Sequence, residues 1–253
     1  MIITSWNVNS LNVRLSHVLQ YLQDEAPDIL GLQELKQTNE AVNMVAFTEA
    51  GYHYAIFGQK TYNGVALLAK EPLQDIVNGI PNFDDEQARA IAASVGNVRV
   101  LNLYVPNGKA VGDEKYTYKL QWLTAVTAYI ETLRREHDNL VIMGDFNIAP
   151  DDLDVHDPEK WRDAILCSQP ERQALHDILA LGFIDAYRHC YPQEQQFSWW
   201  DYRMGGLRRN IGLRIDLNLC STALTVQDAG VHMAPRRWER PSDHAPAWVK
   251  IDV

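Results

Sequence analysis

Apolar residues along this chain follow two patterns, one with helical spacing and one in short continuous runs. The helical spacing is clearest between Arg14 and Glu25 and, over the longest stretch, between Glu114 and His137. The short runs, such as LVIMGD at 140–145, end at glycine, asparagine, aspartate or proline, as buried strands do. Together the patterns predict strands over 1–8, 29–34, 52–57, 64–69, 88–95, 98–105, 140–145, 214–221 and 245–253, and helices over 14–25, 39–50, 114–137 and 168–182.

Local signals fix several of these boundaries. Gly96-Asn97 joins two apolar runs and predicts a hairpin. Ser168 and Glu171 have the spacing of a capping box, and Gly182 is a natural C-terminal glycine for the helix that follows. Several strands come in succession, so two packed sheets with helices outside fit better than a doubly wound parallel sheet. No linker or repeat interrupts the chain, which predicts a single domain over 1–253.

An acid and an amide stand two residues apart at the end of one predicted strand, in LVIMGDFNIAP at 140–150. Two residues apart on an extended chain, Asp145 and Asn147 share a face. A buried carboxylate is costly without a partner. The two residues therefore either cap a turn or face a shared polar partner such as a metal or a phosphate.

Similar polar residues recur at other strand ends. They are Asn7, Asn9, Glu34, Asp216, Asp243 and His244. Each alone has an ordinary explanation as a turn residue or a surface pair. Together with Asp145 and Asn147 they occupy five places, and Glu34 and Asp216 stand beside strongly apolar neighbours, which favours a shared site. If Asp216 and His244 are paired, the carboxylate should raise the pKa of the imidazole.

The residue types narrow the chemistry of such a site. Carboxylate and amide oxygens suit Mg²⁺ or Mn²⁺ rather than Zn²⁺, and bound Mg²⁺ commonly contacts a substrate phosphate. A histidine beside an acid can stabilise or protonate a phosphate oxygen. Metal-assisted phosphoester hydrolysis uses all these groups. The chain has neither a GxxxxGK[ST] loop nor a GxSxG turn, so the sequence does not support a P-loop nucleotidase or a serine hydrolase of that type.

Charge and composition qualify this interpretation. The net charge is −10, which by itself argues against nucleic acid as a partner. Between Arg203 and Arg240, however, seven arginines and three acids give a net charge of +4 and leave −14 elsewhere, so a local basic face and ordinary surface arginines are both open.

Three widely spaced cysteines predict reduced thiols and a cytoplasmic protein. No signal peptide or membrane span is expected, and monomer is the default.

Eight motifs in one order give the chain a resemblance to the exonuclease III branch of the endonuclease/exonuclease/phosphatase superfamily. They are WNVNSLNVR (6–14), DILGLQELK (28–36), NGVALLAK (63–70), NLYVPNG (102–108), VIMGDFNIAP (141–150), FSWWDYR (197–203), GLRIDLNLCS (212–221) and RPSDHAP (240–246). GDFN and SDH are shared across the superfamily, whereas the others narrow the resemblance to its DNA-repair branch.

The resemblance implies a four-layer, DNase I-like α/β sandwich with Mg²⁺, or alternatively Mn²⁺, at the top of its two sheets. It implies catalytic roles for Tyr104, Asp145, Asn147, Asp216 and His244, and metal contacts from Asn7, Glu34, Asp145, Asn147, Asp243 and His244. It implies DNA contacts from Asn9, Lys36, Asn107, Trp199, Trp200, Arg203 and Leu213. One of the two tryptophans should nevertheless lie in the core.

The expected substrate is double-stranded DNA with abasic sites or 3′ ends, cut as an abasic-site endonuclease, a 3′–5′ exonuclease and a 3′-phosphatase. Two other functions stay open. One is a superfamily phosphatase acting on a phospholipid or inositol phosphate, against which the first motif and FSWWDYR argue. The other is a non-catalytic DNA- or protein-binding module, against which the retained acids and histidine argue, because buried charges without a metal role are costly.

Overall fold

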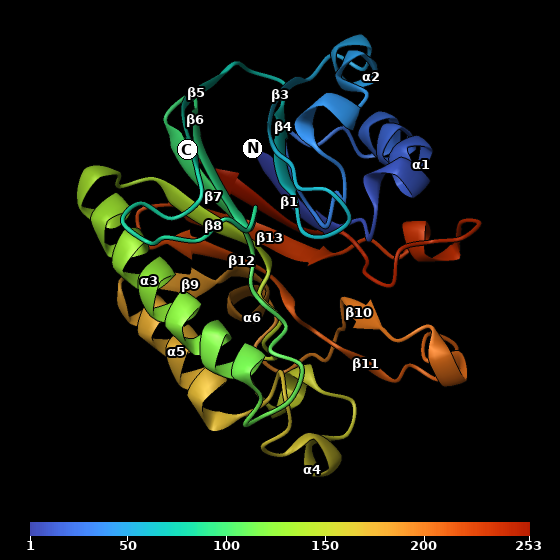
Figure 1. Ribbon diagram of the computed structural model, residues 1–253, viewed down its shortest axis with the longest axis vertical. Helices are drawn as coiled ribbons and strands as arrows, with labels where there is room; N and C mark the ends of the chain where they lie inside the picture. Colours follow the sequence, from blue (N-terminus) through green and yellow to red (C-terminus); the bar gives the residue numbers. More distant parts are fainter.

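Two six-stranded mixed sheets form the centre of the computed structural model, which describes residues 1–253 (Figure 1). The first sheet has the order β13-β14-β1-β2-β4-β3, and the second β5-β6-β7-β8-β12-β9. The strands of the first are β1 (Ile2–Asn7), β2 (Ile29–Gln33), β3 (His53–Phe57), β4 (Val65–Ala69), β13 (Thr225–Val231) and β14 (Ala247–Asp252). Those of the second are β5 (Leu73–Asn78), β6 (Ala90–Val95), β7 (Val98–Tyr104), β8 (Leu140–Asp145), β9 (Phe183–Asp185) and β12 (Asp216–Ser221).

Helices cover the outer face of each sheet and complete four layers. In Figure 1, α1 (Leu11–Asp24) and α2 (Met44–Glu49) lie outside the first sheet, and α3 (Glu114–Glu136) and α5 (Gln169–Ala180) lie outside the second. Shorter elements complete the chain: α4 (Pro158–Trp161), α6 (Ala186–Cys190), the pair β10 (Trp199–Trp200) and β11 (Gly212–Leu213), and 3₁₀ turns at Asn39–Ala41, Asp152–Asp154, Arg203–Gly205 and Ala234–Arg237.

Three apolar clusters match the three interfaces between these layers. The cluster between the sheets includes Ile3, Leu67, Val100 and Met143, which come from both sheets. A second packs α3 and α5 on one sheet, and a third packs α1 and α2 on the other. Burial of these continuous apolar surfaces is the main stabilising contribution to the fold. The expected four-layer α/β sandwich is confirmed.

Most expected elements are present within a residue or two. The hairpin at Gly96-Asn97 joins β6 and β7, and the capping box of Ser168 and Glu171 opens α5. The expected start of the first helix at Arg14 is late, because α1 begins at Leu11 and Arg14 is its one non-helical residue. The range 39–50 holds a 3₁₀ turn and the short α2 rather than one helix. The sequence patterns also missed β5, β9, β13 and α6, and the short elements α4, β10 and β11.

Strands from the two ends of the chain are neighbours in one sheet. β1 pairs with β14 on one side and with β2 on the other. The single domain over 1–253 stays a prediction, with which this pairing of the two chain ends is consistent. All three cysteines are free. None of the helices combines the length and the apolar character needed to cross a lipid bilayer.

The strand ends that carry the polar residues meet at one edge of the molecule. β1, β2, β7 and β8 finish there, and β12 and β14 begin there. Gly144 allows β7 and β8 to approach at this edge, because a Cβ at its φ of +152° would lie 2.0 Å from the carbonyl oxygen of Leu103. A side chain immediately before Asp145 would therefore push the two strands apart.

Candidate active site

A cleft of about 1090 Å³ opens at this edge, between the ends of the two sheets. Its floor carries the strand-end groups Glu34, Tyr104, Asp145, Asn147, Asp243 and His244. Its walls come from the segment around α4 and from the loop that follows β10. The sequence-predicted residues are thus brought together from positions throughout the chain.

Tyr104, Asp145 and Asp216 stand side by side on three neighbouring strands. In the register of the sheet Tyr104 on β7 is opposite Asp145 on β8, and Asp145 is opposite Asp216 on β12. Residues directly opposite each other in a ladder project to the same face. The sheet therefore places two carboxylates and a phenol in one row.

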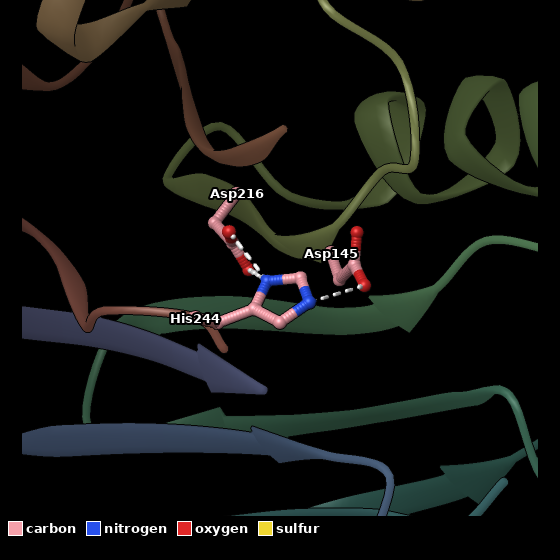
Figure 2. A group of neighbouring side chains, drawn as sticks. All are labelled: Asp145, Asp216 and His244. Atoms are coloured by element: carbon pink, nitrogen blue, oxygen red, sulfur yellow. Dashed lines mark hydrogen bonds and ion pairs between the residues drawn. The ribbon is translucent and has the colours of Figure 1, made fainter. Parts of the chain in front are cut away.

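The imidazole of His244 lies between the two carboxylates (Figure 2). Its Nδ1 is 2.8 Å from Asp216 Oδ2, and its Nε2 is 3.7 Å from Asp145 Oδ2. Ser198, which the sequence analysis did not assign, donates a hydrogen bond of 2.6 Å to Asp216 Oδ2. Its position in the FSWWDYR motif was the available signal. The expected pairing of Asp216 with His244 is confirmed.

The charges of Asp145, Asp216 and His244, together with burial, shift the pKa values of His244 and Asp145. Burial alone would lower the pKa of His244, but Asp216 and Asp145 outweigh it and raise the pKa to about 10. Burial raises the pKa of Asp145 to about 7, with His244 opposing the rise and Asp216 adding to it. At neutral pH His244 is therefore protonated, while Asp145 can exchange a proton.

Asn7 joins Asp145 to Glu34, which follows β2 in the other sheet. The Asn7 Nδ2 donates 2.9 Å hydrogen bonds both to Asp145 Oδ2 and to Glu34 Oε1. Lys36 Nζ lies 2.8 Å from Glu34 Oε2. Burial disfavours the Glu34 carboxylate, but Lys36 and the Asn7 hydrogen bond together lower its pKa. Glu34 and Lys36 both have positive φ, a conformation that non-glycine residues hold only where the surroundings fix it.

Asn147 is fixed by hydrogen bonds at its backbone and at both side-chain atoms. Its backbone N–H donates to Asp145 Oδ1 at 2.9 Å, and its Nδ2 donates to the carbonyl oxygen of Val105 at 3.0 Å. Its Oδ1 accepts from Asn107 Nδ2 at 3.0 Å. The amide keeps one Nδ2 hydrogen and one Oδ1 lone pair for a bound group. Asp145 and Asn147 thus share one site rather than only capping a turn.

Asp243 belongs to a second polar group beside the site. Its Oδ1 accepts from Asn9 Nδ2 at 2.9 Å, and its Oδ2 accepts from Trp199 Nε1 at 3.0 Å. Asn9 also accepts from Lys36 Nζ at 2.6 Å. Burial opposes ionisation of Asp243, but His244 and these donors lower its pKa. These hydrogen bonds connect Trp199 to Asp243, the neighbour of His244 in the chain.

Tyr104 lies against the carboxylates. Burial, followed by the charges of Glu34 and Asp145, raises its pKa well above the ordinary value. The phenol therefore keeps its proton and acts as a hydrogen-bond donor. The guanidinium of Arg89 is 4.8 Å from the centre of the Tyr104 ring, and it holds the ring by a cation–π contact.

The structure corrects the assignment of Trp200 as a DNA contact. Trp200 is 2% exposed and packs with Phe197 and Ala245, so it is the core member of the tryptophan pair. Trp199 is half-buried and lines the cleft. Leu213 is 0% exposed and lies behind the cleft wall, where Trp199 packs against it, so its assignment as a direct DNA contact is corrected as well.

The arginine-rich segment is only partly a surface feature, so neither of the two interpretations left open for it holds for all seven arginines. Arg214 is buried, with Nε 2.7 Å from Asp154 and an Nη atom 2.7 Å from Asp185. Arg236 is also buried. The exposed members are Arg203, Arg208, Arg209, Arg237 and Arg240, and Arg203 is paired with Asp201. Arg203 and Arg209 line the cleft.

The donor set suits a hard divalent cation. Asp145, Asp216 and His244 each offer an atom within 4.8 Å of the others. In that cluster Nδ1 of His244 is engaged by Asp216, so a cation there would compete with this hydrogen bond. Glu34 and Asp145, which share Asn7 as a donor, offer carboxylate oxygens that suit Mg²⁺ or Mn²⁺. A cation would also favour the ionised form of Asp145, which burial otherwise disfavours.

Comparison with known proteins agrees with this geometry. Residues 4–244 match the Endonuclease/Exonuclease/phosphatase family. The chain is 36% identical to exodeoxyribonuclease III of Haemophilus influenzae over 98% of both chains. It superposes on a structure of the 3′ phosphatase NExo from Neisseria bound to product DNA hairpin with a TM-score of 0.99, 46% identity and complete coverage of both chains. An AP endonuclease from Archaeoglobus fulgidus gives a TM-score of 0.95 and 36% identity over both full chains.

The fold and site therefore define a phosphoester-cleaving enzyme, and the chain belongs to the Endonuclease/Exonuclease/phosphatase family. Within that family it is a nuclease of the exonuclease III type, a hydrolase of DNA repair.

Proposed function

We propose that this nuclease hydrolyses phosphate esters of double-stranded DNA at abasic sites and at 3′ ends, with Mg²⁺ or Mn²⁺ as cofactor. The single observation that supports this most strongly is the arrangement of Tyr104, Asp145, His244 and Glu34 at the floor of one cleft, with Asp216 holding His244 from behind and Asn7 bridging the two carboxylates. One site of this kind attacks an internal phosphodiester, a terminal phosphodiester or a terminal phosphate by the same chemistry.

Glu34 and Asp145, with Asn7 between them, would hold the cation. When bound, the cation polarises the phosphate and offsets the negative charge that develops on it. Asn7 keeps the two carboxylates at a fixed separation through its paired 2.9 Å hydrogen bonds. Asp243 is a further candidate for metal contact, although both of its carboxylate oxygens already accept hydrogen bonds from protein donors. His244 is a poor candidate, because the protonated ring has no nitrogen lone pair to offer a cation.

Asp145 orients the attacking water and accepts its proton. Its Oδ1 is held by the backbone N–H of Asn147, which leaves the carboxylate in one orientation. Asn147 uses its remaining amide hydrogen and lone pair to hold the phosphate and the water. Because these groups are rigid before substrate arrives, little reorganisation is needed during the reaction.

His244 donates from Nε2 to a phosphate oxygen, while its Nδ1–H is held by Asp216. This is consistent with the raised pKa of the imidazole, which keeps both nitrogens protonated at neutral pH. Tyr104 contributes a second donor, its neutral phenol, from the other side of Asp145. Protonated His244 and the phenol together stabilise negative charge on the phosphate in the transition state.

The walls of the cleft supply contacts to DNA. Trp199, packed in front of the buried Leu213, presents an apolar surface suited to an extruded sugar or a frayed terminal nucleotide. Arg203 and Arg209 supply positive charge at the same cleft. Asn9, Lys36 and Asn107 add polar groups close to the phosphate. The relative from Neisseria that gives the TM-score of 0.99 is described as bound to a DNA hairpin, which supports this placement.

A panel of labelled duplexes tests the proposal. Substrates with an abasic site, a recessed 3′ end, a 3′-phosphate and no lesion are incubated with Mg²⁺, with and without EDTA. Cleavage of the first three substrates with Mg²⁺, and none with EDTA, is expected. Activity that persists in EDTA would refute the metal role, and no cleavage of any duplex would refute the substrate class.

Two alternative functions are distinguished by the duplex panel together with two added measurements. A phospholipid or inositol phosphate phosphatase would release phosphate from those head groups and leave the duplexes intact. A binding module would retain abasic duplex in a gel shift without cutting it. We further propose that the enzyme acts as a monomer in the cytoplasm. Sedimentation at working concentration tests the first point, and cell fractionation tests the second.

A further inference from the structure

A fully buried ion pair lies directly behind the cleft floor. Lys119 on α3 and Glu171 on α5 are in contact, and both side chains are 0% exposed. Neither residue lines the cleft, and neither was assigned a role from the sequence. Glu171 was predicted only as the glutamate of the capping box of α5, and Lys119 had no signal at all.

Lys119 holds the two loops that carry the site amides. Its Nζ donates to the carbonyl oxygen of Asn147 at 2.7 Å and to that of Asn107 at 3.3 Å. The third hydrogen goes to Glu171 Oε1. The side chains of Asn107 and Asn147 are themselves hydrogen bonded in front of the ammonium group. The ammonium group of Lys119 therefore fixes the backbone at Asn107 and at Asn147, the two residues whose side-chain amides face the substrate.

Glu171 extends the same network to the wall of the cleft. Its Oε1 also accepts from the backbone N–H of Leu166, and its Oε2 accepts from the backbone N–H of Ser168, each at 3.1 Å. The hydroxyl of Ser168 donates to Oε2 at 2.6 Å. Leu166 lines the cleft. The ion pair thus connects the floor of the cleft to its wall.

Both anchored cleft residues have unfavourable backbone conformations. Asn147 has a φ of +49° and Leu166 a φ of +71°. Positive φ is costly for a branched residue such as leucine and persists only where several contacts fix it. A hydrogen bond of 2.8 Å from the backbone N–H of Ala149 to the carbonyl oxygen of Leu166 links the two segments directly.

Stability alone is a weak explanation for this pair. Removing two charges from water is expensive, and apolar residues of similar shape often stabilise a fold as well or better. The pair here has every donor and acceptor engaged, and four of its partners are backbone groups of the cleft segments. Its arrangement favours a role in geometry rather than in stability.

We propose that Lys119 and Glu171 are positioning residues, which set the amide of Asn147 relative to the phosphate and the wall at Leu166 relative to the floor. This rests on the proposed function, in which Asn147 holds phosphate and water. The pair should then affect turnover more than metal binding or DNA binding, because the metal-holding carboxylates are not among its hydrogen-bond partners.

The test uses the double variant Lys119→Met with Glu171→Gln, which removes both charges without leaving one unpaired. We expect kcat on abasic duplex to fall by about 10- to 100-fold, the range for a small displacement of a reacting group. KM and the Mg²⁺ concentration for half-maximal rate should stay within about twofold, since uniform binding is retained. In a protein that already carries Asn147→Ala, the same double change should lower kcat by a further factor of less than about three.

Arg99→Met is the matched control. Arg99 is a buried cation at the far end of β7 and contacts the backbone of Asp75. Its loss should lower the melting temperature and leave kcat unchanged. Lys119→Arg, which keeps the charge, should recover part of the lost turnover. It also serves as the variant to measure if the double variant does not fold.

A readout independent of activity separates this inference from the proposed function. In the ¹⁵N spectrum, the side-chain amide signals of Asn107 and Asn147 should move in the double variant and stay in place in Arg99→Met. Unmoved amide signals, an unchanged kcat, or a loss fully multiplicative with Asn147→Ala would each overturn the positioning role. If the wild-type protein cleaves no duplex, the proposed function is refuted. The amide signals of Asn107 and Asn147 still test whether Lys119 and Glu171 position these two side chains.

Discussion

Replacing Asp216 by asparagine should make the activity of the enzyme newly sensitive to alkaline pH. Asp216 is the largest of the charges that raise the pKa of His244, to about 10, against burial that lowers it. Asparagine keeps the size of the side chain and an acceptor for Nδ1 but loses the charge. The pKa of His244 must then fall, so the protonated form is lost at a lower pH.

The size of the effect follows from the fraction of protonated His244. With a pKa of about 10, wild-type His244 is almost fully protonated at pH 6 and at pH 8. If the pKa in the variant returns to about 6.5, roughly 75% is protonated at pH 6 but only about 3% at pH 8. The rate of Asp216→Asn relative to wild type should therefore fall by about 25-fold between these pH values.

The assay is the single-turnover rate on abasic duplex at half-unit intervals of pH from 6 to 9. Taking the ratio of variant to wild-type rates cancels the titration of groups remote from Asp216. The pKa of Asp145 does depend on Asp216, so the rates are measured at saturating Mg²⁺, which favours the ionised form of Asp145 in both proteins. Asp243→Asn is the control, because Asp243 raises the pKa of His244 less than Asp216 or Asp145 does. A ratio that stays constant over the whole pH range would refute the charged role of His244.

Three further predictions concern the metal, the DNA and the tryptophans. Glu34→Gln should raise the Mg²⁺ concentration for half-maximal activity, and an unchanged titration would leave Glu34 as the partner of Lys36 only. Duplex binding should weaken with salt, and removing Arg208 and Arg209 should reduce the slope of log K against log salt by about 0.9 for each phosphate that these side chains neutralise. Trp200→Ala should cost about 3–5 kcal/mol of stability, measured by urea unfolding, whereas Trp199→Ala, which removes a half-buried ring, should cost less stability and raise KM for abasic duplex. The opposite assignment of the two tryptophans would contradict the burial argument.

Apolar patterning predicted the central strands because their faces are buried on both sides. LVIMGD at β8 is fully buried, and its continuous apolar run is what a central strand requires. β5 and β13 were missed because they are edge strands with mostly exposed or half-buried residues. Their polar sequences, LQDIVN and TVQDAGV, carry little of the apolar signal on which the prediction depended.

The site residues could be predicted where strand ends carry acids and amides. Ion pairs between residues that are far apart in the sequence could not be predicted. Arg214 was counted with the surface arginines, since its partners Asp154 and Asp185 are 60 and 29 residues away. Lys119 escaped notice for the same reason, because its partner Glu171 is 52 residues away. Such pairings depend on the finished packing of the layers and leave no local pattern in the chain.

The central claim is that Asp145 orients and deprotonates the water that attacks a DNA phosphate, and the single-turnover rate of Asp145→Asn on abasic duplex tests it most directly. The account predicts a rate lower by about 10²–10⁴-fold at saturating Mg²⁺. Duplex binding should be nearly unchanged, and the melting temperature should be equal or higher, because a buried carboxylate with a pKa raised to about 7 is replaced by a neutral amide. A folded variant that keeps more than about a tenth of the wild-type rate would contradict the account.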